Sequence, residues 1–129
     1  MYGRKKVRTF TVNGMLSKIQ GVKNACSRNQ RRYGNDSMIV SRQYKRLISL
    51  CNSLAIAFSQ YKLEYQSLDL LKLAQSADMF LYDNGDYFDR LWPGRLVTFN
   101  NFAYMFARTG DYTGALKFIY DGQSLIASI

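Results

Sequence analysis

The stretch Leu96–Ile119, LVTFNNFAYMFARTGDYTGALKFI, carries the clearest structural signal in the chain. Its apolar residues recur at the i, i+3, i+4 spacing of one helical face, at Leu96, Phe99, Phe102, Ala103 and Phe106 and then, after a break, at Tyr112, Ala115, Leu116 and Ile119. The break is Thr109-Gly110-Asp111. Gly can adopt the left-handed conformation that ends a helix, and Asp can cap the start of the next one. The stretch therefore predicts two helices that are joined by a tight turn and packed against each other.

A weaker copy of this pattern lies earlier in the chain. A shift of 48 residues superposes Leu54-Ala55 on Phe102-Ala103. We expect one helix over residues 38–62 and a second over about Glu64–Leu81, with Ser67 at the position of a small residue. The segment Tyr82–Gly94 would connect the two hairpins. The sequence thus predicts an all-α fold with two antiparallel helical hairpins.

These patterns resemble the tetratricopeptide (TPR) repeat, a helical hairpin whose two helices meet through small residues. The best match spans residues 96–119, and a weaker second repeat spans 47–81. The residues that fit the repeat's signature positions are Phe99, Phe102, Ala103, Phe106, Gly110-Asp111-Tyr112, Ala115 and Ile119, with Gly122 where an Ala is usual. The shift of 48 residues exceeds the usual period of 34. The resemblance implies a TPR-like domain at 47–129 that serves as a binding scaffold.

The resemblance also implies a protein-binding groove along the first helices of the two repeats. The matching positions are Asn52, Ile56, Gln60, Asn100, Tyr104 and Arg108. Asn side chains can hydrogen-bond a peptide backbone, and Arg108 can pair with a carboxylate. Asn100 and Asn101 fit equally well as packing residues between helices. The lysines with which the family clamps the C-terminal carboxylates of chaperones do not occur at these positions, so that ligand is not expected.

Residues 1–46 form a basic segment, with twelve of the 18 basic residues of the chain and one acid, Asp36. Its composition predicts a largely irregular N-terminal arm, which would become ordered on an acidic surface. The residues expected to contact that surface are Arg4, Lys5, Lys6, Arg8, Arg28, Arg31 and Arg32. An anionic protein lattice such as tubulin and the phosphates of RNA are both suitable partners.

The sequence offers little for catalysis or for metal binding. It has no His, which excludes the usual Ser/His and Cys/His nucleophiles. Its two cysteines form no metal-binding pair, and Cys51 on an apolar helical face fits a buried thiol. Asp83, Asp86 and Asp89 fit a solvated acidic turn better than a cation site. We therefore expect no enzymatic activity, cofactor, metal or small-molecule substrate.

These observations predict a non-catalytic scaffold or adaptor subunit of a large intracellular assembly. Its helical body would bind protein partners, and its basic arm would lie on an acidic surface, for example on a cytoskeletal or ciliary microtubule. The alternative is a ribonucleoprotein subunit, as in a mitochondrial ribosome, that uses the arm to bind RNA. The sequence contains no run of 18 apolar residues, so no membrane span is predicted. The apolar core of a secretory signal does not occur near the start. The expected location is the cytoplasm or the cytoskeleton. The mitochondrion is the alternative, because the basic start of the chain, with no acid before Asp36, resembles a mitochondrial import segment.

Overall fold

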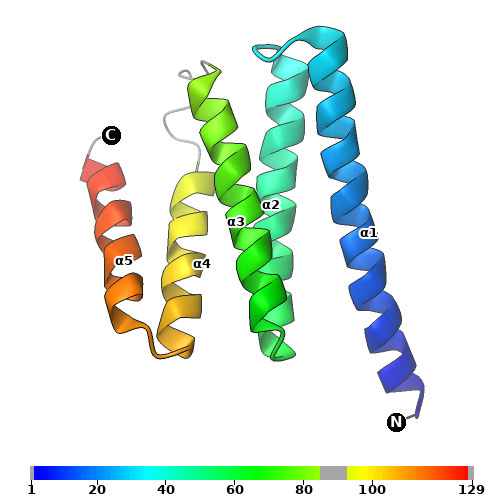
Figure 1. Ribbon diagram of the computed structural model, residues 1–129, viewed down its shortest axis with the longest axis vertical. Coiled ribbons are helices and arrows are strands. Elements are labelled where there is room, and N and C mark those ends of the chain that lie inside the picture. The colour runs from blue at the N-terminus through cyan, green and yellow to red at the C-terminus, as the bar shows by residue number, and fades with distance from the viewer. Residues whose placement is uncertain (1, 85–92, 128–129) are drawn as a thin grey trace.

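The computed structural model in Figure 1 describes residues 2–84 and 93–127, with side chains from Val12 onward. Over this part of the chain it contains five helices and no strand, which confirms the predicted all-α class. The helices are α1 (Tyr2–Tyr33), α2 (Met38–Gln60), α3 (Glu64–Asp83), α4 (Gly94–Arg108) and α5 (Tyr112–Ala127). Successive helices run in alternating directions (Figure 1). Of the expected connector Tyr82–Gly94, Tyr82 and Asp83 belong to α3 and Gly94 begins α4, while residues 85–92 lie outside the described part.

The first hairpin consists of α2 and α3. The Ser37 side chain accepts a hydrogen bond from the Ile39 amide (3.1 Å) and so caps α2. The two helices approach closely at Ser67, a buried residue whose hydroxyl donates to the Ala55 carbonyl (2.7 Å). The turn between them places Lys62 in the left-handed region (φ 62°). The small residue expected at position 67 therefore does lie at the helix contact.

The second hairpin, α4 and α5, has the turn chemistry that its sequence predicts. Gly110 adopts a positive φ of 86°, and the Asp111 side chain accepts a hydrogen bond from the Gly114 amide (2.9 Å) at the start of α5. Stacked rings of Phe102, Phe106 and Phe118 fill the space between the two helices. The expected helix–turn–helix over 96–119 is confirmed.

The prediction of a largely irregular arm over residues 1–46 is wrong, because α1 is a continuous helix over Tyr2–Tyr33. It passes without a break through Asn13-Gly14, a pair of residues that is typical of turns. A narrow stripe of side chains explains the difference, at Val12, Met15, Ile19, Val22 and Cys26. This spacing of three and four residues gives the helix one apolar seam, and the last three of these residues are buried in a cluster shared with α2 and α3. The expectation of disorder treated the segment alone, whereas packing against α2 buries its apolar face.

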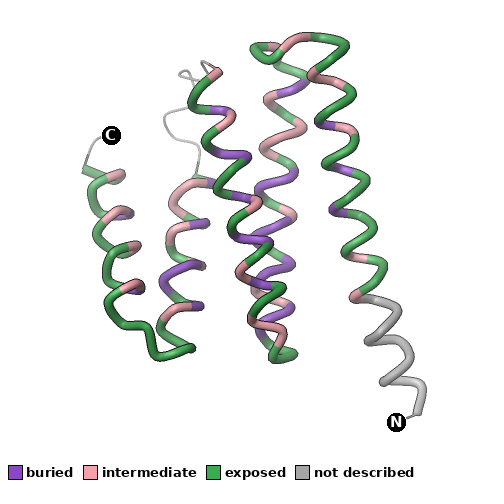
Figure 2. Tube along the Cα trace, in the orientation of Figure 1, coloured by how far each residue is buried: buried purple, intermediate pink, exposed green. Residues whose placement is uncertain are grey.

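The predicted division of the chain after residue 46 falls inside α2, which runs without interruption from Met38 to Gln60. A single apolar cluster joins residues of α1, α2, α3 and α4. Figure 2 shows that buried residues are concentrated on α2, α3 and α4, whereas α1 and α5 at the two edges are mostly exposed. The five helices therefore form a row in which α4 packs against both α2 and α3.

Candidate functional site: a groove between α2 and α4

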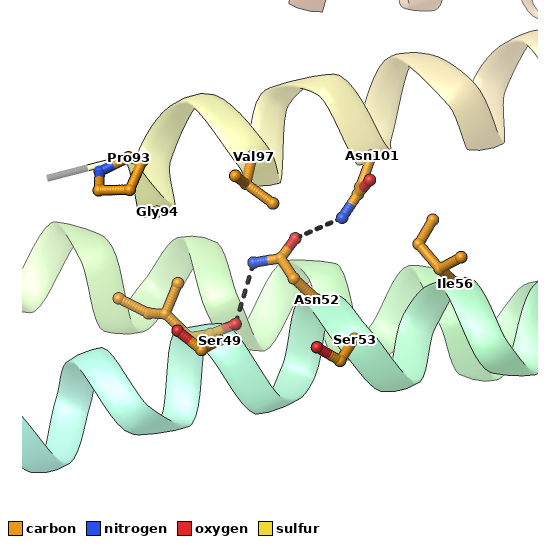
Figure 3. A pocket seen from close by; sticks show the side chains of 9 residues that line it. Ser49, Asn52, Ser53, Ile56, Pro93, Gly94, Val97 and Asn101 are labelled. Atoms are coloured by element: carbon orange, nitrogen blue, oxygen red, sulfur yellow. Dashed lines mark hydrogen bonds between the residues drawn. The ribbon is translucent and has the colours of Figure 1, made fainter.

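The first helices of the two hairpins, α2 and α4, lie side by side and enclose a pocket of about 340 Å³ (Figure 3). Its lining combines apolar and small polar side chains, from Ile48, Ser49, Asn52, Ser53, Ile56, Pro93, Gly94, Val97 and Asn101. Ile48 is fully buried, while Val97 at the rim is 42% exposed. The pocket thus has a rigid base on two helices and an accessible apolar edge.

A network of amides fixes the distance between the two helices (Figure 3). Asn52 is 4% exposed, and its Nδ2 donates to the Ile48 carbonyl (2.9 Å) and to Thr98 Oγ1 (2.8 Å). Its Oδ1 accepts from Asn101 Nδ2 (2.8 Å). Because both Asn52 N–H groups and its oxygen are engaged within the protein, the Asn52 amide holds the groove together and is not available to bind a peptide backbone.

Four of the other predicted groove residues lie along the groove, and these are Ile56, Gln60, Tyr104 and Arg108. Ile56 lines the pocket, and the exposed Gln60 follows one turn later on α2. On α4, the Arg108 Nη1 donates to the hydroxyl of the 44%-exposed Tyr104 (2.9 Å). Arg108 also donates from Nη2 to the Ser59 carbonyl (3.3 Å), which holds the guanidinium at the C-terminal end of α2.

Asn100 is separated from this group. It is exposed and lies near α5, where its Oδ1 would be 4.0 Å from a Cβ added at Gly122. Asn101 takes the place in the groove that was expected for Asn100. The repeat alignment equated Asn52 with Asn100, but a position one residue later faces α2.

The sequence prediction missed seven residues of the pocket, which are Ile48, Ser49, Ser53, Pro93, Gly94, Val97 and Asn101. A signal for four of them, Ser49, Ser53, Val97 and Asn101, is present in the sequence. Ser49, Ser53, Ile56 and Gln60 follow at intervals of four, three and four, and so do Val97, Asn101, Tyr104 and Arg108. Such spacing marks one line along a helix. The two lines face the same groove.

The helices differ in whether they contain acidic residues. The helices α1, α2 and α4 contain basic residues and no acidic one. The acids in the described part lie on α3, on α5 and in two turns, at Asp36, Glu64, Asp69, Asp78, Asp83, Asp111 and Asp121. The two helices that form the groove therefore bring positive charge and no negative charge to it.

An ion pair joins the two hairpins on the other side of α4. Arg95 donates from Nε to Asp78 Oδ2 on α3, and its guanidinium lies over the ring of Tyr82 (5.1 Å to the centroid). The Asp78 side chain is 9% exposed and that of Arg95 is 26% exposed. This pair fixes the position of α4 relative to α3, and with it one wall of the groove.

The predicted anion-binding residues lie on α1, away from the groove pocket. Arg28, Arg31 and Arg32 are exposed, and Arg32 lies over the ring of Tyr33 (5.5 Å to the centroid). The remaining residues of this prediction, Arg4, Lys5, Lys6 and Arg8, belong to the first turns of α1, and their side chains lie outside the described part. The described arginines form a basic surface at the C-terminal end of α1.

The two thiols lie in the interface between α1 and α2. Cys26 and Cys51 are free and buried, and burial raises the pKa of Cys26 to about 11 and that of Cys51 to about 12. Both are therefore neutral thiols at physiological pH, and the burial predicted for Cys51 is confirmed. Among the described residues, no group of three His, Cys, Asp or Glu side chains is placed to hold a metal ion. Asp86 and Asp89 of the predicted acidic turn lie outside them.

No helix in the described part is long and apolar enough to cross a membrane. Comparison with known proteins adds no identification: neither a protein-family model, nor a curated protein, nor a solved structure matches the chain. The TPR resemblance stays a prediction.

Proposed function

We propose that the protein is a non-catalytic helical adaptor that binds a segment of a partner protein in the groove between α2 and α4. The observation that carries this proposal is the pocket of about 340 Å³, with its buried apolar base and its exposed apolar rim at Val97. This volume is at the small end of the range for ligand pockets, which suits an apolar side chain of a peptide.

The polar residues around the pocket support a peptide ligand. The hydroxyls of the exposed Ser49 and Ser53 lie along one side, and the half-buried amide of Asn101 lies on the other. These groups can donate to and accept from a peptide backbone. The walls are two helices held by the Asn52 network, so the site is formed before a ligand arrives and less ordering is needed on binding.

A second surface, on α1, supports membership in a larger assembly. Its exposed arginines, Arg28, Arg31 and Arg32, can contact an acidic protein surface, of which a microtubule is one example. The acid-free composition of α1 also favours the alternative function, a ribonucleoprotein subunit that contacts RNA phosphates. RNA binding by this surface would weaken steeply with added salt, in proportion to the number of phosphates that are neutralised.

The adaptor function can be tested by selecting binders from a display library of random peptides on the full-length protein. We expect the selected peptides to lose binding to the variant Val97→Asp, which places a charge at the rim of the pocket. Leu116→Asp is the matched control, because Leu116 is similarly exposed (49%) but lies on α5. Peptides that bind Val97→Asp as well as wild type, or a selection that yields no binder, would contradict the proposal.

A further inference from the structure

We infer that the groove is selective for an acidic segment, in which one apolar residue enters the pocket and carboxylates lie about three residues before and after it. This inference rests on the proposed function and adds to it the chemical class of the ligand.

The first observation is a line of side chains along α2 that extends beyond the pocket. Positions 42, 46, 49, 53, 56 and 60 follow at intervals of four, three, four, three and four, so they share one face of the helix. Ser49, Ser53 and Ile56 from this line contact the pocket. Arg46 and Arg42 are exposed one and two turns earlier on the same line, where they lie at one end of the groove.

The second observation is a positive charge at the other end. Arg108 is held across the groove by its hydrogen bonds to the Tyr104 hydroxyl and to the Ser59 carbonyl. A guanidinium has five N–H donors, so further donors remain for a carboxylate. Neither α2 nor α4 contains an acid, and the described charges along the groove, Arg42 and Arg46 at one end and Arg108 at the other, have the same sign.

The helix geometry sets the spacing of the ligand. Along α2, Arg46 and Ser59 are separated by about 20 Å at 1.5 Å per residue. An extended peptide of about six residues covers this distance at about 3.4 Å per residue. Asn52, at the base of the pocket, lies about midway along the same axis, so each carboxylate falls about three residues from the apolar residue.

The lining of the pocket favours a peptide over RNA as the acidic ligand. Between the basic ends lie Ile48, Ile56 and Val97, which suit an aliphatic side chain. The ring of Tyr104, which a base would need for stacking, already lies against the guanidinium of Arg108 (5.6 Å to the centroid). An RNA strand would place phosphates against the apolar part of the groove.

The inference can be tested with a fluorescein-labelled peptide, Gly-Glu-Ser-Ser-Leu-Ser-Ser-Glu-Gly, titrated with the full-length protein by fluorescence anisotropy. We expect replacement of both Glu by Gln, or of Leu by Ser, to weaken binding about tenfold or more. Arg46→Glu, Arg42→Glu and Arg108→Glu should each weaken it about threefold to tenfold, as expected for loss and reversal of an exposed charge pair. Lys72→Glu, which reverses an exposed positive charge on α3, should leave binding of the peptide unchanged.

Each other outcome overturns the inference in a recognisable way. If the Gln peptide binds as tightly as the Glu peptide and Val97→Asp abolishes both, the groove binds peptides without selecting acids, and the adaptor function stands. If neither peptide binds while the display library yields binders lost on Val97→Asp, the ligand has another composition. If a uridine oligonucleotide binds, loses affinity on Arg46→Glu, and the peptide does not bind, the groove is an RNA surface and the adaptor function fails as well.

Discussion

The two hairpins are built alike, but their second helices differ in burial. On α3 the buried residues are Ser67, Leu70, Leu71, Ala74, Ala77, Asp78 and Leu81, whereas on α5 they are Ala115 and Gly122. The reason is position, since α3 is packed between α2 and α4 while α5 packs against α4. The apolar residues that α5 leaves exposed are Tyr112, Leu116, Ile119, Tyr120 and Ile126. Burial of a hairpin's second helix thus depends on the hairpin that follows it.

The first helices of the hairpins differ from the second helices in charge. Acids occur on α3 and α5 and are absent from the sequences of α2 and α4. The pocket between α2 and α4 is lined by uncharged residues, and among the acids of α3, Asp78 pairs with Arg95 of α4. Under the proposed function, the first helices bind the ligand and the second helices support them.

Removal of the Arg95–Asp78 ion pair between the hairpins should have the largest effect on stability. Arg95→Met leaves the buried Asp78 carboxylate without its partner, and we expect the free energy of unfolding to fall by about 3 kcal/mol. Urea denaturation followed by circular dichroism measures it. The double variant Asp78→Leu/Arg95→Met should recover more than half of the loss, because it removes the unpaired charge. Equal losses in the single and double variants would show that the loss does not come from the unpaired Asp78 carboxylate.

Replacement by Ala should lower the free energy of unfolding more at Asn52 than at the equivalent position Asn100. Asn52→Ala removes three hydrogen bonds of the buried network and should cost about 2 kcal/mol of unfolding free energy. Asn100→Ala, at an exposed site, should change it by less than about 0.5 kcal/mol. Thermal and urea unfolding of both variants give the comparison. Similar costs would mean that the two hairpins use these positions alike.

The helix α1 covers the first hairpin, and the thiols of Cys26 and Cys51 are buried in this contact. Their burial should make the folded state less stable at alkaline pH. In the unfolded chain a thiol loses its proton near pH 9, while the buried thiols keep theirs to about pH 11 and 12. The folded state therefore binds more protons above pH 9, so its stability falls as pH rises and is unaffected below that value. The expected loss is about 1 kcal/mol per thiol at pH 10.

This loss is measured as the difference between wild type and Cys26→Ala/Cys51→Ala in urea unfolding at pH 8 and pH 10, which cancels the titration of other groups. The double variant should show the smaller decline. An identical decline in both proteins would show that the thiols are not buried between α1 and α2.

The two hairpin turns should give the smallest effects, with opposite signs. Gly110→Ala forces a side chain into the left-handed region and should cost about 1 kcal/mol. Lys62→Gly relieves the same conformation in the first hairpin, and the added freedom of the unfolded chain offsets part of the gain, which leaves about 0.5 kcal/mol of stabilisation. Differential scanning calorimetry of both variants tests this. Destabilisation by Lys62→Gly would show that the Lys62 side chain contributes more than its backbone strain costs.

Much of the fold could be predicted from local sequence patterns. The repeated apolar spacing, Gly110 and Asp111 define the second hairpin, and the pattern around Ser67 indicates the first. The helix α1 was missed because its apolar seam is narrow, and the surrounding basic and polar residues resemble those of a disordered segment. Burial of Ile19 and Val22 depends on α2, a contact between distant parts of the sequence that a local pattern does not contain.

The candidate site could be predicted in part. The alignment of the two repeats found Asn52 and Ile56 on α2 and Arg108 on α4. It assigned Asn100 in place of Asn101, because a one-residue difference in register turns a side chain by about 100° around a helix. The engagement of Asn52 with Thr98 also could not be predicted, since it depends on how α4 packs against α2.

The most direct test of ligand binding by the first helices is a map of amide shifts in ¹⁵N-labelled full-length protein titrated with the Glu-and-Leu peptide. We expect the shifts to be concentrated at Arg46, Ser49, Ser53, Ile56, Val97, Asn101 and Arg108, with the amides of α3 and α5 largely unchanged. Shifts concentrated on α5, or on the arginines at the end of α1, would contradict the assignment of the groove as the binding site.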